Sequence, residues 1–241
     1  MREAPLGYPW PVAVRPNMTL AVKRLIRDAA RRLPELAHVR ASRVLVVAGE
    51  ARRGSRATIR PAHFKETRRR ASGAGRTKPL IRIKGRKMLY VVTLRPLWFV
   101  DSTPEERIDT ILHELYHASA RFDGTLHRGR RHSALPQPRY DRRIRALRDR
   151  YLARAPDDVV APFAHSGVVK ARMWLERPGR SYRPGEYGGR RVYTERQLFY
   201  GLMPMRGPRR RGAHGNGRDG ARGASRRALE LLAQPRKAGA A

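Results

Sequence analysis

The chain has 241 residues, of which 54 are Lys or Arg and 20 are Asp or Glu, so its formal net charge is +34. It contains no Cys, which excludes disulfides, thiolate catalysis and Cys-based zinc sites, and leaves His and carboxylates to hold any metal ion. The charge excludes an acidic solvating protein and makes nucleic acid the first partner to consider, although GC-rich codon usage would also favour Arg.

No stretch approaches the ~18 consecutive apolar residues that a membrane span requires. The first residues contain repeated prolines and no continuous apolar run, so they do not form a convincing signal peptide. The sequence therefore predicts a protein without membrane contact, located in the cytoplasm.

The beginning of the chain predicts an irregular lead-in followed by a helix. Residues 1–18 hold four prolines, and Thr19 then looks like an N-cap. Apolar residues follow at helical spacing with Lys and Arg on the other face, and Pro34 stops the run. We expect an amphipathic helix over residues 20–33.

A small sheet of three or four strands is predicted next. Residues 43–48 form a short β-branched run, typical of a buried strand. A strand near 56–60 leads into a basic loop, the alternation at 81–84 suits an edge strand, and residues 88–94 are apolar enough for a central strand.

Two helices are predicted after these strands. Thr103, Pro104 and Glu106 have the pattern of a capping box with Pro at the first helical position, so a helix should begin at Pro104. Its wide apolar surface indicates deep packing against the sheet. A second amphipathic helix is expected at about 139–154, before Pro156.

The remainder of the chain divides into two parts. Residues 156–205 have apolar content broken by Pro and Gly, which predicts a C-terminal extension packed irregularly on a domain formed by residues 19–155. Residues 206–241 are rich in Gly, Arg and Ala, which predicts a disordered basic tail. The fold class expected overall is α+β.

The helix that begins at Pro104 contains an H-E-x-x-H motif, His113-Glu-Leu-Tyr-His117. Residues at i and i+4 lie one turn apart on one helix face, so both imidazoles can bind one zinc ion. Zinc lowers the pKa of a bound water to roughly 7, and the carboxylate of Glu114 can take its proton as the water attacks a carbonyl.

A catalytic zinc site needs a third protein ligand, and three residues beyond His117 are candidates. His132 is favoured because it lies just before a packed helix, which would fix its position. His127 lies inside a turn. Asp123 has the spacing of metzincin-type sites, but these need a Gly where this chain has Ala120, which favours a continued helix.

A developing oxyanion also needs a hydrogen-bond donor. Tyr116, Tyr140 and the many arginines are candidates. Of these, Tyr140 is more simply explained as a core residue of the second helix, and the sequence does not select among them.

Several short segments in residues 100–152 resemble the metallopeptidases found in phages and bacteria, which are similar to the SprT-like zincin families. The resemblance implies a zincin-like fold and a zinc peptidase with Glu114 as general base. It implies that the metal ligands are His113, His117 and a later His ahead of the last helix, which fits His132. The segments that carry the resemblance are His113-Glu-Leu-Tyr-His117, Phe122-Asp-Gly124, Gly129-Arg-Arg-His-Ser133 and Tyr140-Asp141.

Basic residues flank the motif on both sides. Residues 52–87 contain 14 cations and one anion, and residues 121–154 contain 11 cations and three anions. Arg contacts to phosphates would give affinity for nucleic acid without sequence readout, and the basic tail could add loose contacts. The same charge could instead select acidic protein substrates.

Together these features predict a zinc-dependent metallopeptidase that hydrolyses peptide bonds, acting on proteins associated with nucleic acid such as DNA. The alternative is a basic nucleic-acid-binding protein whose zinc site is structural or decayed. A third reading is a zinc hydrolase of a non-peptide amide. An edge strand beside the metal would favour the peptidase, and a small closed pocket would favour the amidase.

Overall fold

The computed structural model describes residues 15–50, 55–63, 77–99, 101–130, 132–134, 136–179, 181–183 and 191–206. These residues form an α+β fold with two small mixed sheets, which confirms the predicted fold class. Most of the lead-in expected over 1–18 and all but Arg206 of the tail expected over 206–241 lie outside the described residues.

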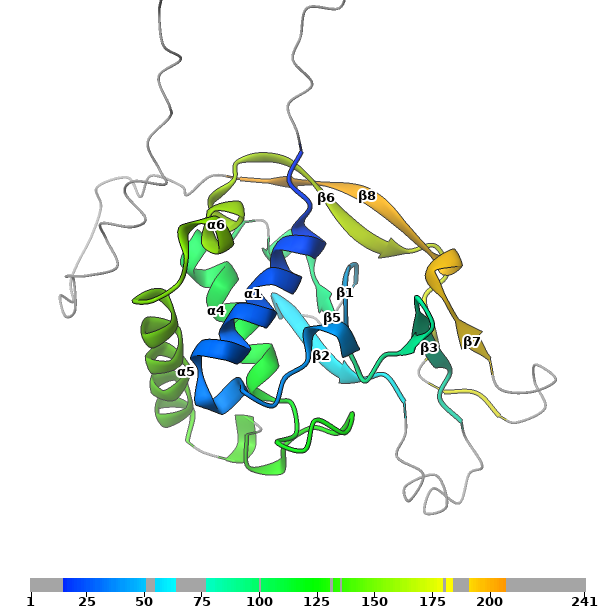
Figure 1. Cartoon of the computed structure of the whole chain (residues 1–241), viewed down its shortest axis with the longest axis horizontal. Coiled ribbons are helices and arrows are strands. Elements are labelled where there is room, and N and C mark those ends of the chain that lie inside the picture. Colours follow the sequence, from blue (N-terminus) through cyan, green and yellow to red (C-terminus); the bar gives the residue numbers. More distant parts are fainter. Residues whose placement is uncertain are drawn as a thin grey trace, which may run out of the picture.

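The prediction of a sheet of three or four strands is wrong, because residues 167–174 and 198–205 add two strands and give a main sheet of five strands in mixed directions. Its order is β2-β5-β1-β6-β8, with β1 parallel to β5 and to β6, and with β2 and β8 antiparallel to their neighbours. Helices α1 (Met18–Arg32), α4 (Pro104–Tyr116), α5 (Gln137–Leu152) and α6 (Asp157–Val160) lie to one side of this sheet, and the β6–β8 hairpin crosses the top of the molecule (Figure 1). The strands are β1 (Val44–Ala48), β2 (Ala57–Pro61), β5 (Tyr90–Leu94), β6 (Gly167–Trp174) and β8 (Leu198–Met205).

Helix α1 (Met18–Arg32) begins two residues before its predicted start, because Asn17 is its N-cap. The Asn17 side-chain oxygen accepts a hydrogen bond from the Leu20 backbone N–H. Thr19, the expected N-cap, lies inside the helix, and its hydroxyl oxygen accepts from the backbone N–H of Arg172 in β6 at 2.8 Å. A long-range contact therefore uses the side chain that the sequence assigned to capping.

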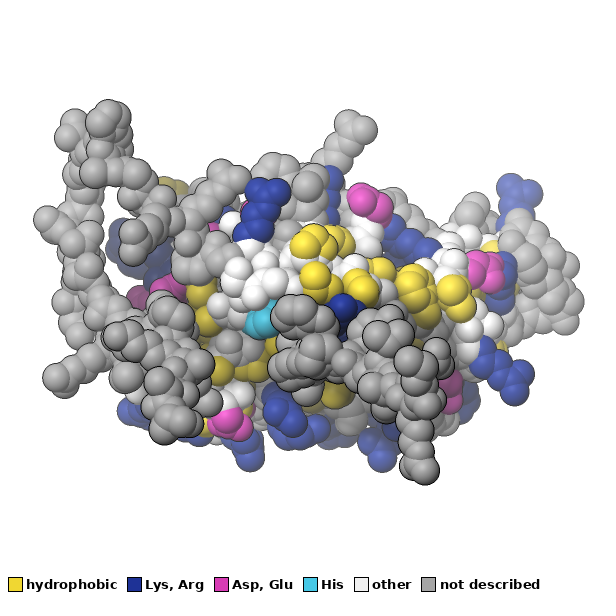
Figure 2. Space-filling view, turned by 90° about the horizontal axis from the view of Figure 1, so that it is seen from above, with side chains coloured by type: hydrophobic (Ala, Val, Ile, Leu, Met, Phe, Trp, Pro, Cys, Tyr) yellow, Lys and Arg dark blue, Asp and Glu magenta, His cyan; other side chains and the backbone are white. Residues whose placement is uncertain are grey.

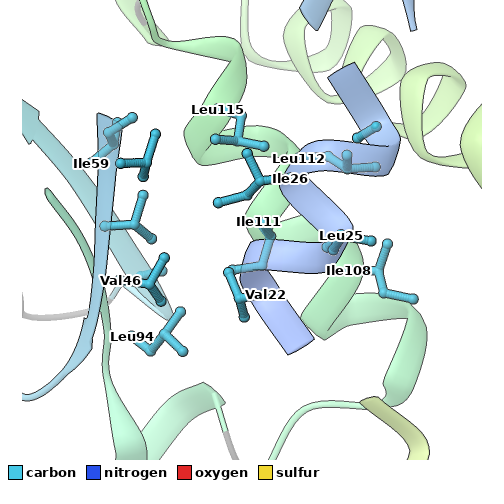
Figure 3. Close-up of a cluster of buried hydrophobic side chains, with 14 of the residues drawn as sticks. Val22, Leu25, Ile26, Val46, Ile59, Leu94, Ile108, Ile111, Leu112 and Leu115 are labelled. Atoms are coloured by element: carbon cyan, nitrogen blue, oxygen red, sulfur yellow. The ribbon is translucent and has the colours of Figure 1, made fainter. Parts of the chain in front are cut away.

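Helix α4 (Pro104–Tyr116) begins where its capping box predicts. The Thr103 hydroxyl accepts from the Glu106 N–H, and the Glu106 carboxylate accepts from the Thr103 N–H. One face of α4 meets α1 and the sheet in the hydrophobic core (Figure 3). This packing fixes the rotation of α4 and thereby the direction of its polar residues. The core side chains labelled in Figure 3 are Val22, Leu25, Ile26, Val46, Ile59, Leu94, Ile108, Ile111, Leu112 and Leu115.

The predicted irregular packing of residues 156–205 is wrong. This region contains the short helix α6 (Asp157–Val160) and the eight-residue strands β6 and β8, which pair along their whole length. The inner face of the hairpin buries Val169, Ala171 and Met203 in the same core as α1 and α4. The outer face mixes apolar and basic residues, so the sequence shows no clear alternation of apolar and polar positions.

The expected edge strand at 81–84 is also placed differently. Strand β3 (Leu80–Ile83) is the middle strand of a separate sheet, between β4 (Arg86–Lys87) and β7 (Val192–Tyr193). Ile81 and Ile83 join a second core cluster with Leu45 and Val47, on the face of β1 opposite the main core. The strand thus covers the main sheet instead of extending it.

Arg107, on α4, ties distant segments together. Its side chain is fully buried and donates to the carbonyl oxygens of Phe99 at 3.2 Å, Phe163 at 2.5 Å and Arg206 at 2.7 Å. Burial lowers the pKa of this guanidinium to about 10.

None of the helices in the described part of the chain has the length and apolar character of a membrane span.

Candidate metal centre

Three histidines from two segments meet at the end of α4. His113 lies in the last turn of α4, His117 is the C-cap residue of that helix, and His132 opens a short 3₁₀ turn ahead of α5 (Gln137–Leu152). One ring nitrogen from each residue lies within 4.8 Å of the other two. The structure therefore brings together the three residues that the sequence favoured as ligands.

The spacing of these imidazoles fits a single small metal ion. The ring centroids are 4.9 Å apart for His113 and His117, 4.9 Å for His113 and His132, and 5.0 Å for His117 and His132. The Nε2 atoms of His113 and His132 are 3.2 Å apart. Two nitrogens bound at 2.0–2.1 Å to one tetrahedral ion would be roughly 3.3 Å apart.

The orientation of His117 is set by a backbone carbonyl. Its Nδ1 lies 2.7 Å from the Arg130 carbonyl oxygen, which can only accept, so Nδ1 carries the hydrogen and Nε2 keeps its lone pair. The Arg130 guanidinium in turn donates to the carbonyl oxygens of Glu35 and Tyr116 and lies over the Tyr116 ring. Such a partner on the second nitrogen is what orients metal-binding histidines.

Burial keeps two of these imidazoles neutral, and metal ions bind the neutral form. Burial, followed by the charges of His117 and His132, lowers the pKa of His113 to about 3. Burial also lowers the pKa of His117. His132 is exposed to solvent, so the group is open on that side.

The Glu114 side chain extends from α4 to β2, an outer strand of the main sheet. Its Oε2 atom accepts a hydrogen bond of 2.7 Å from the backbone N–H of Ile59 in β2. Burial raises the pKa of this carboxyl to about 8, against the opposing effect of the hydrogen bond from Ile59. The carboxyl thus holds a proton far more readily than an exposed Glu does.

Tyr140, on α5, is a core residue, as the sequence suggested, but it also adjoins the three histidines. Its side chain is 1% exposed, and its ring centroid lies 5.4 Å from that of His113, 6.1 Å from that of His117 and 4.8 Å from that of His132. Its hydroxyl oxygen is 3.4 Å from His117 Nε2. The Tyr116 hydroxyl lies beside Arg143, whose guanidinium donates a hydrogen bond to it.

The two other candidate ligands take part in the turn after α4. Asp123 accepts from the backbone N–H and the hydroxyl of Thr125, as a turn-forming Asp does. The His127 backbone N–H donates to the His117 carbonyl oxygen, and its imidazole is not part of the three-histidine group. The helix does not continue through Ala120, because the chain folds back here into a tight turn.

Sequence reasoning missed two backbone groups that shape the site, the Arg130 carbonyl and the Ile59 N–H. No residue pattern could reveal them, because any residue supplies these groups.

Comparison with protein-family models, with curated proteins and with solved structures finds no match to this chain.

Proposed function

We propose that this protein is a zinc-dependent metallopeptidase. The observation that carries the proposal is the convergence of ring nitrogens from His113, His117 and His132, with Glu114 next to the first of them on the same helix. Three protein ligands leave the fourth tetrahedral position open, as in catalytic zinc sites. Zinc bound there would lower the pKa of a coordinated water to about 7 and polarise a carbonyl group.

The ligand set favours zinc over other common ions. Calcium and magnesium prefer oxygen ligands, and the group offers three imidazole nitrogens. Soft metals prefer thiolates, and the chain has no Cys. Neutral imidazoles suit zinc well, and zinc in a three-histidine site is an established catalytic arrangement.

Glu114 supports a catalytic site over a structural one. A structural zinc ion has its fourth position filled by the protein and gains nothing from a nearby buried carboxyl group. A carboxyl with a raised pKa can accept the proton of an attacking water and then deliver it to the leaving amine nitrogen. The hydrogen bond between Glu114 and the backbone of β2 supports a substrate that binds beside that strand.

Strand β2 supports a peptide as the substrate. It is one of the two outer strands of the main sheet and pairs only with β5 among the described strands. The Arg56 carbonyl and the Ala62 N–H bond toward β5, so the alternate residue Ile59 turns its N–H and carbonyl away from β5. The Ile59 N–H bonds to Glu114, and the Ile59 carbonyl stays on the outer edge of the strand. An extended peptide could add there as a further strand, next to the motif, which supports a zincin-like arrangement over a small amidase pocket.

Metal content tests the proposal most directly. The purified chain is expected to carry one zinc ion, measured by elemental mass spectrometry, and His113→Ala is expected to lose it because two ligands alone hold zinc weakly. His165→Ala, which removes a described histidine outside the group, should retain the ion. Absence of metal after growth with ample zinc would contradict the proposed peptidase function. It would favour the alternative, a basic nucleic-acid-binding protein.

We further propose that the peptidase works on proteins bound to DNA. Helix α5, which carries Tyr140, exposes several arginines, and Lys and Arg side chains are also visible on the face of the molecule seen from above (Figure 2). Such surfaces bind phosphates without reading the sequence. The exposed arginines of α5 are Arg139, Arg142, Arg143, Arg145 and Arg150.

Charge reversal on α5 tests this proposal. The double variant Arg142→Glu/Arg145→Glu is expected to weaken duplex DNA binding and to reduce the slope of log K against log salt by about 2, one for each lost phosphate contact. Fluorescence anisotropy at several salt concentrations measures both. Arg24→Glu/Arg27→Glu on α1 changes the net charge equally and should bind nearly as the wild type does. Equal losses in the two variants would contradict a role for the α5 surface.

A further inference from the structure

The position of the Tyr140 hydroxyl group is set by helix packing. Tyr140, Ile144, Leu147 and Tyr151 form the buried face of α5, and this face packs against α4 and the rest of the main core. The ring of Tyr140 is enclosed by the three imidazoles on one side. The hydroxyl is therefore held in the histidine group by the fold and does not depend on a flexible loop.

The hydrogen-bonding pattern leaves the Tyr140 proton free for another acceptor once a metal is bound. In the structure the hydroxyl lies 3.4 Å from His117 Nε2, a long contact for a hydrogen bond. The Nδ1 of His117 donates to the Arg130 carbonyl, so Nε2 is the atom that would bind the metal. A metal on Nε2 would use its lone pair, and the hydroxyl would then need an acceptor in the open position.

Other donors near the group lie against residues outside it. The Tyr116 hydroxyl oxygen is 3.3 Å from the Arg143 guanidinium, which donates to it, and Arg130 covers the Tyr116 ring. The Arg130 guanidinium donates to the carbonyls of Glu35 and Tyr116. Among the described side chains, Tyr140 is the hydroxyl donor whose oxygen reaches a ligand nitrogen of the group.

We propose that Tyr140 is a catalytic residue that donates a hydrogen bond to the carbonyl oxygen of the scissile peptide bond as that oxygen gains negative charge. The inference rests on the proposed peptidase function. A bond forms between the water oxygen and the carbonyl carbon, and the C–N bond then breaks. Glu114 moves the water proton to the amine nitrogen. Tyr140 keeps its proton throughout and acts by hydrogen bonding alone.

The variant Tyr140→Phe tests the role because it keeps the ring and removes only the hydroxyl. Zinc content should stay at one per chain, and kcat for fluorescein-labelled casein should fall about 100- to 1000-fold with little change in KM, the usual cost of a lost oxyanion donor. Acetohydroxamate binding to the Co²⁺-substituted protein, followed by visible absorption, should weaken about 10- to 100-fold, since its metal-binding oxygens would lose a charge-assisted hydrogen bond.

Two comparisons separate the possible failures. Tyr116→Phe removes a hydroxyl from a neighbouring ring and should leave both readouts at wild-type values. If the wild-type chain takes up neither Zn²⁺ nor Co²⁺, the proposed function itself fails. If the wild type binds both ions and acetohydroxamate, and Tyr140→Phe binds acetohydroxamate as tightly, the Tyr140 inference is overturned and the peptidase stands. Loss of metal from a folded Tyr140→Phe protein, as judged by circular dichroism, also overturns it.

Discussion

Replacement of Glu114 by Gln is expected to abolish peptide hydrolysis and to leave zinc bound. The amide keeps an oxygen that can accept from the Ile59 N–H, so the local structure is retained. It cannot accept a proton, and general-base catalysis contributes about 10²- to 10⁴-fold to the rate. Hydrolysis of fluorescein-labelled casein, measured beside zinc content, checks the two parts of the prediction separately.

A matched control for this variant lies on the same helix. Glu105→Gln makes the same Glu-to-Gln replacement in the first turn of α4, far along the helix from the histidines, and should remain active. Full activity in Glu114→Gln would exclude the general-base role. Loss of zinc in Glu114→Gln would show that this carboxyl holds the metal and does not act on the water.

Replacement of His132 by Ala is expected to weaken zinc binding by more than about 100-fold. Loss of a group that only orients a ligand costs about 10- to 100-fold in affinity, and loss of a ligand should exceed this. Competition with a chromogenic chelator measures the dissociation constant. The Nε2 atoms of His132 and His113 are 3.2 Å apart, so removal of the His132 imidazole opens one side of the group.

His127→Ala serves as the control because it removes a nearby imidazole outside the group. Its zinc affinity should stay within a few-fold of the wild-type value. The opposite result, with His127→Ala losing zinc and His132→Ala retaining it, would transfer the third ligand position to His127 and require a rearrangement of the turn after α4.

The start of α4 and the pairing of its histidines could be predicted because both depend on neighbours in the sequence. Thr103 and Glu106 form the capping box across three residues, and His113 and His117 share a helix face through the helical repeat. The third histidine of the group could not be identified as firmly, because His127 and His132 both lie beyond the helix. Which of the two histidines lies beside His113 and His117 depends on long-range contacts of this segment. One of them is the hydrogen bond from the Arg130 guanidinium to the Glu35 carbonyl, 95 residues apart in the chain.

The β6–β8 hairpin could not be predicted, and Tyr140 could be named as one candidate donor but not selected over Tyr116, for a related reason. The burial of Val169 and Met203 depends on the surfaces of α1 and α4, which are distant in the sequence. The outer face of the hairpin mixes apolar and basic residues, so the sequence shows no regular alternation of apolar and polar positions. Tyr140 satisfies the apolar face of α5, which is a sufficient explanation from sequence alone. Its nearness to the histidines appears only when α5 packs against α4.

The sheet order has a consequence for how the protein is made. Strand β1 lies between β5 and β6, and Ala48 pairs with Met173, which is synthesised much later. Met205, at the end of β8, belongs to the same core as Val22 of α1. Pairings between distant segments form slowly, because a long loop must close before their contacts are made. The apolar face of α1 therefore stays partly exposed to solvent until residues up to Met205 have left the ribosome. A nascent chain that stalls near residue 155 lacks part of the core.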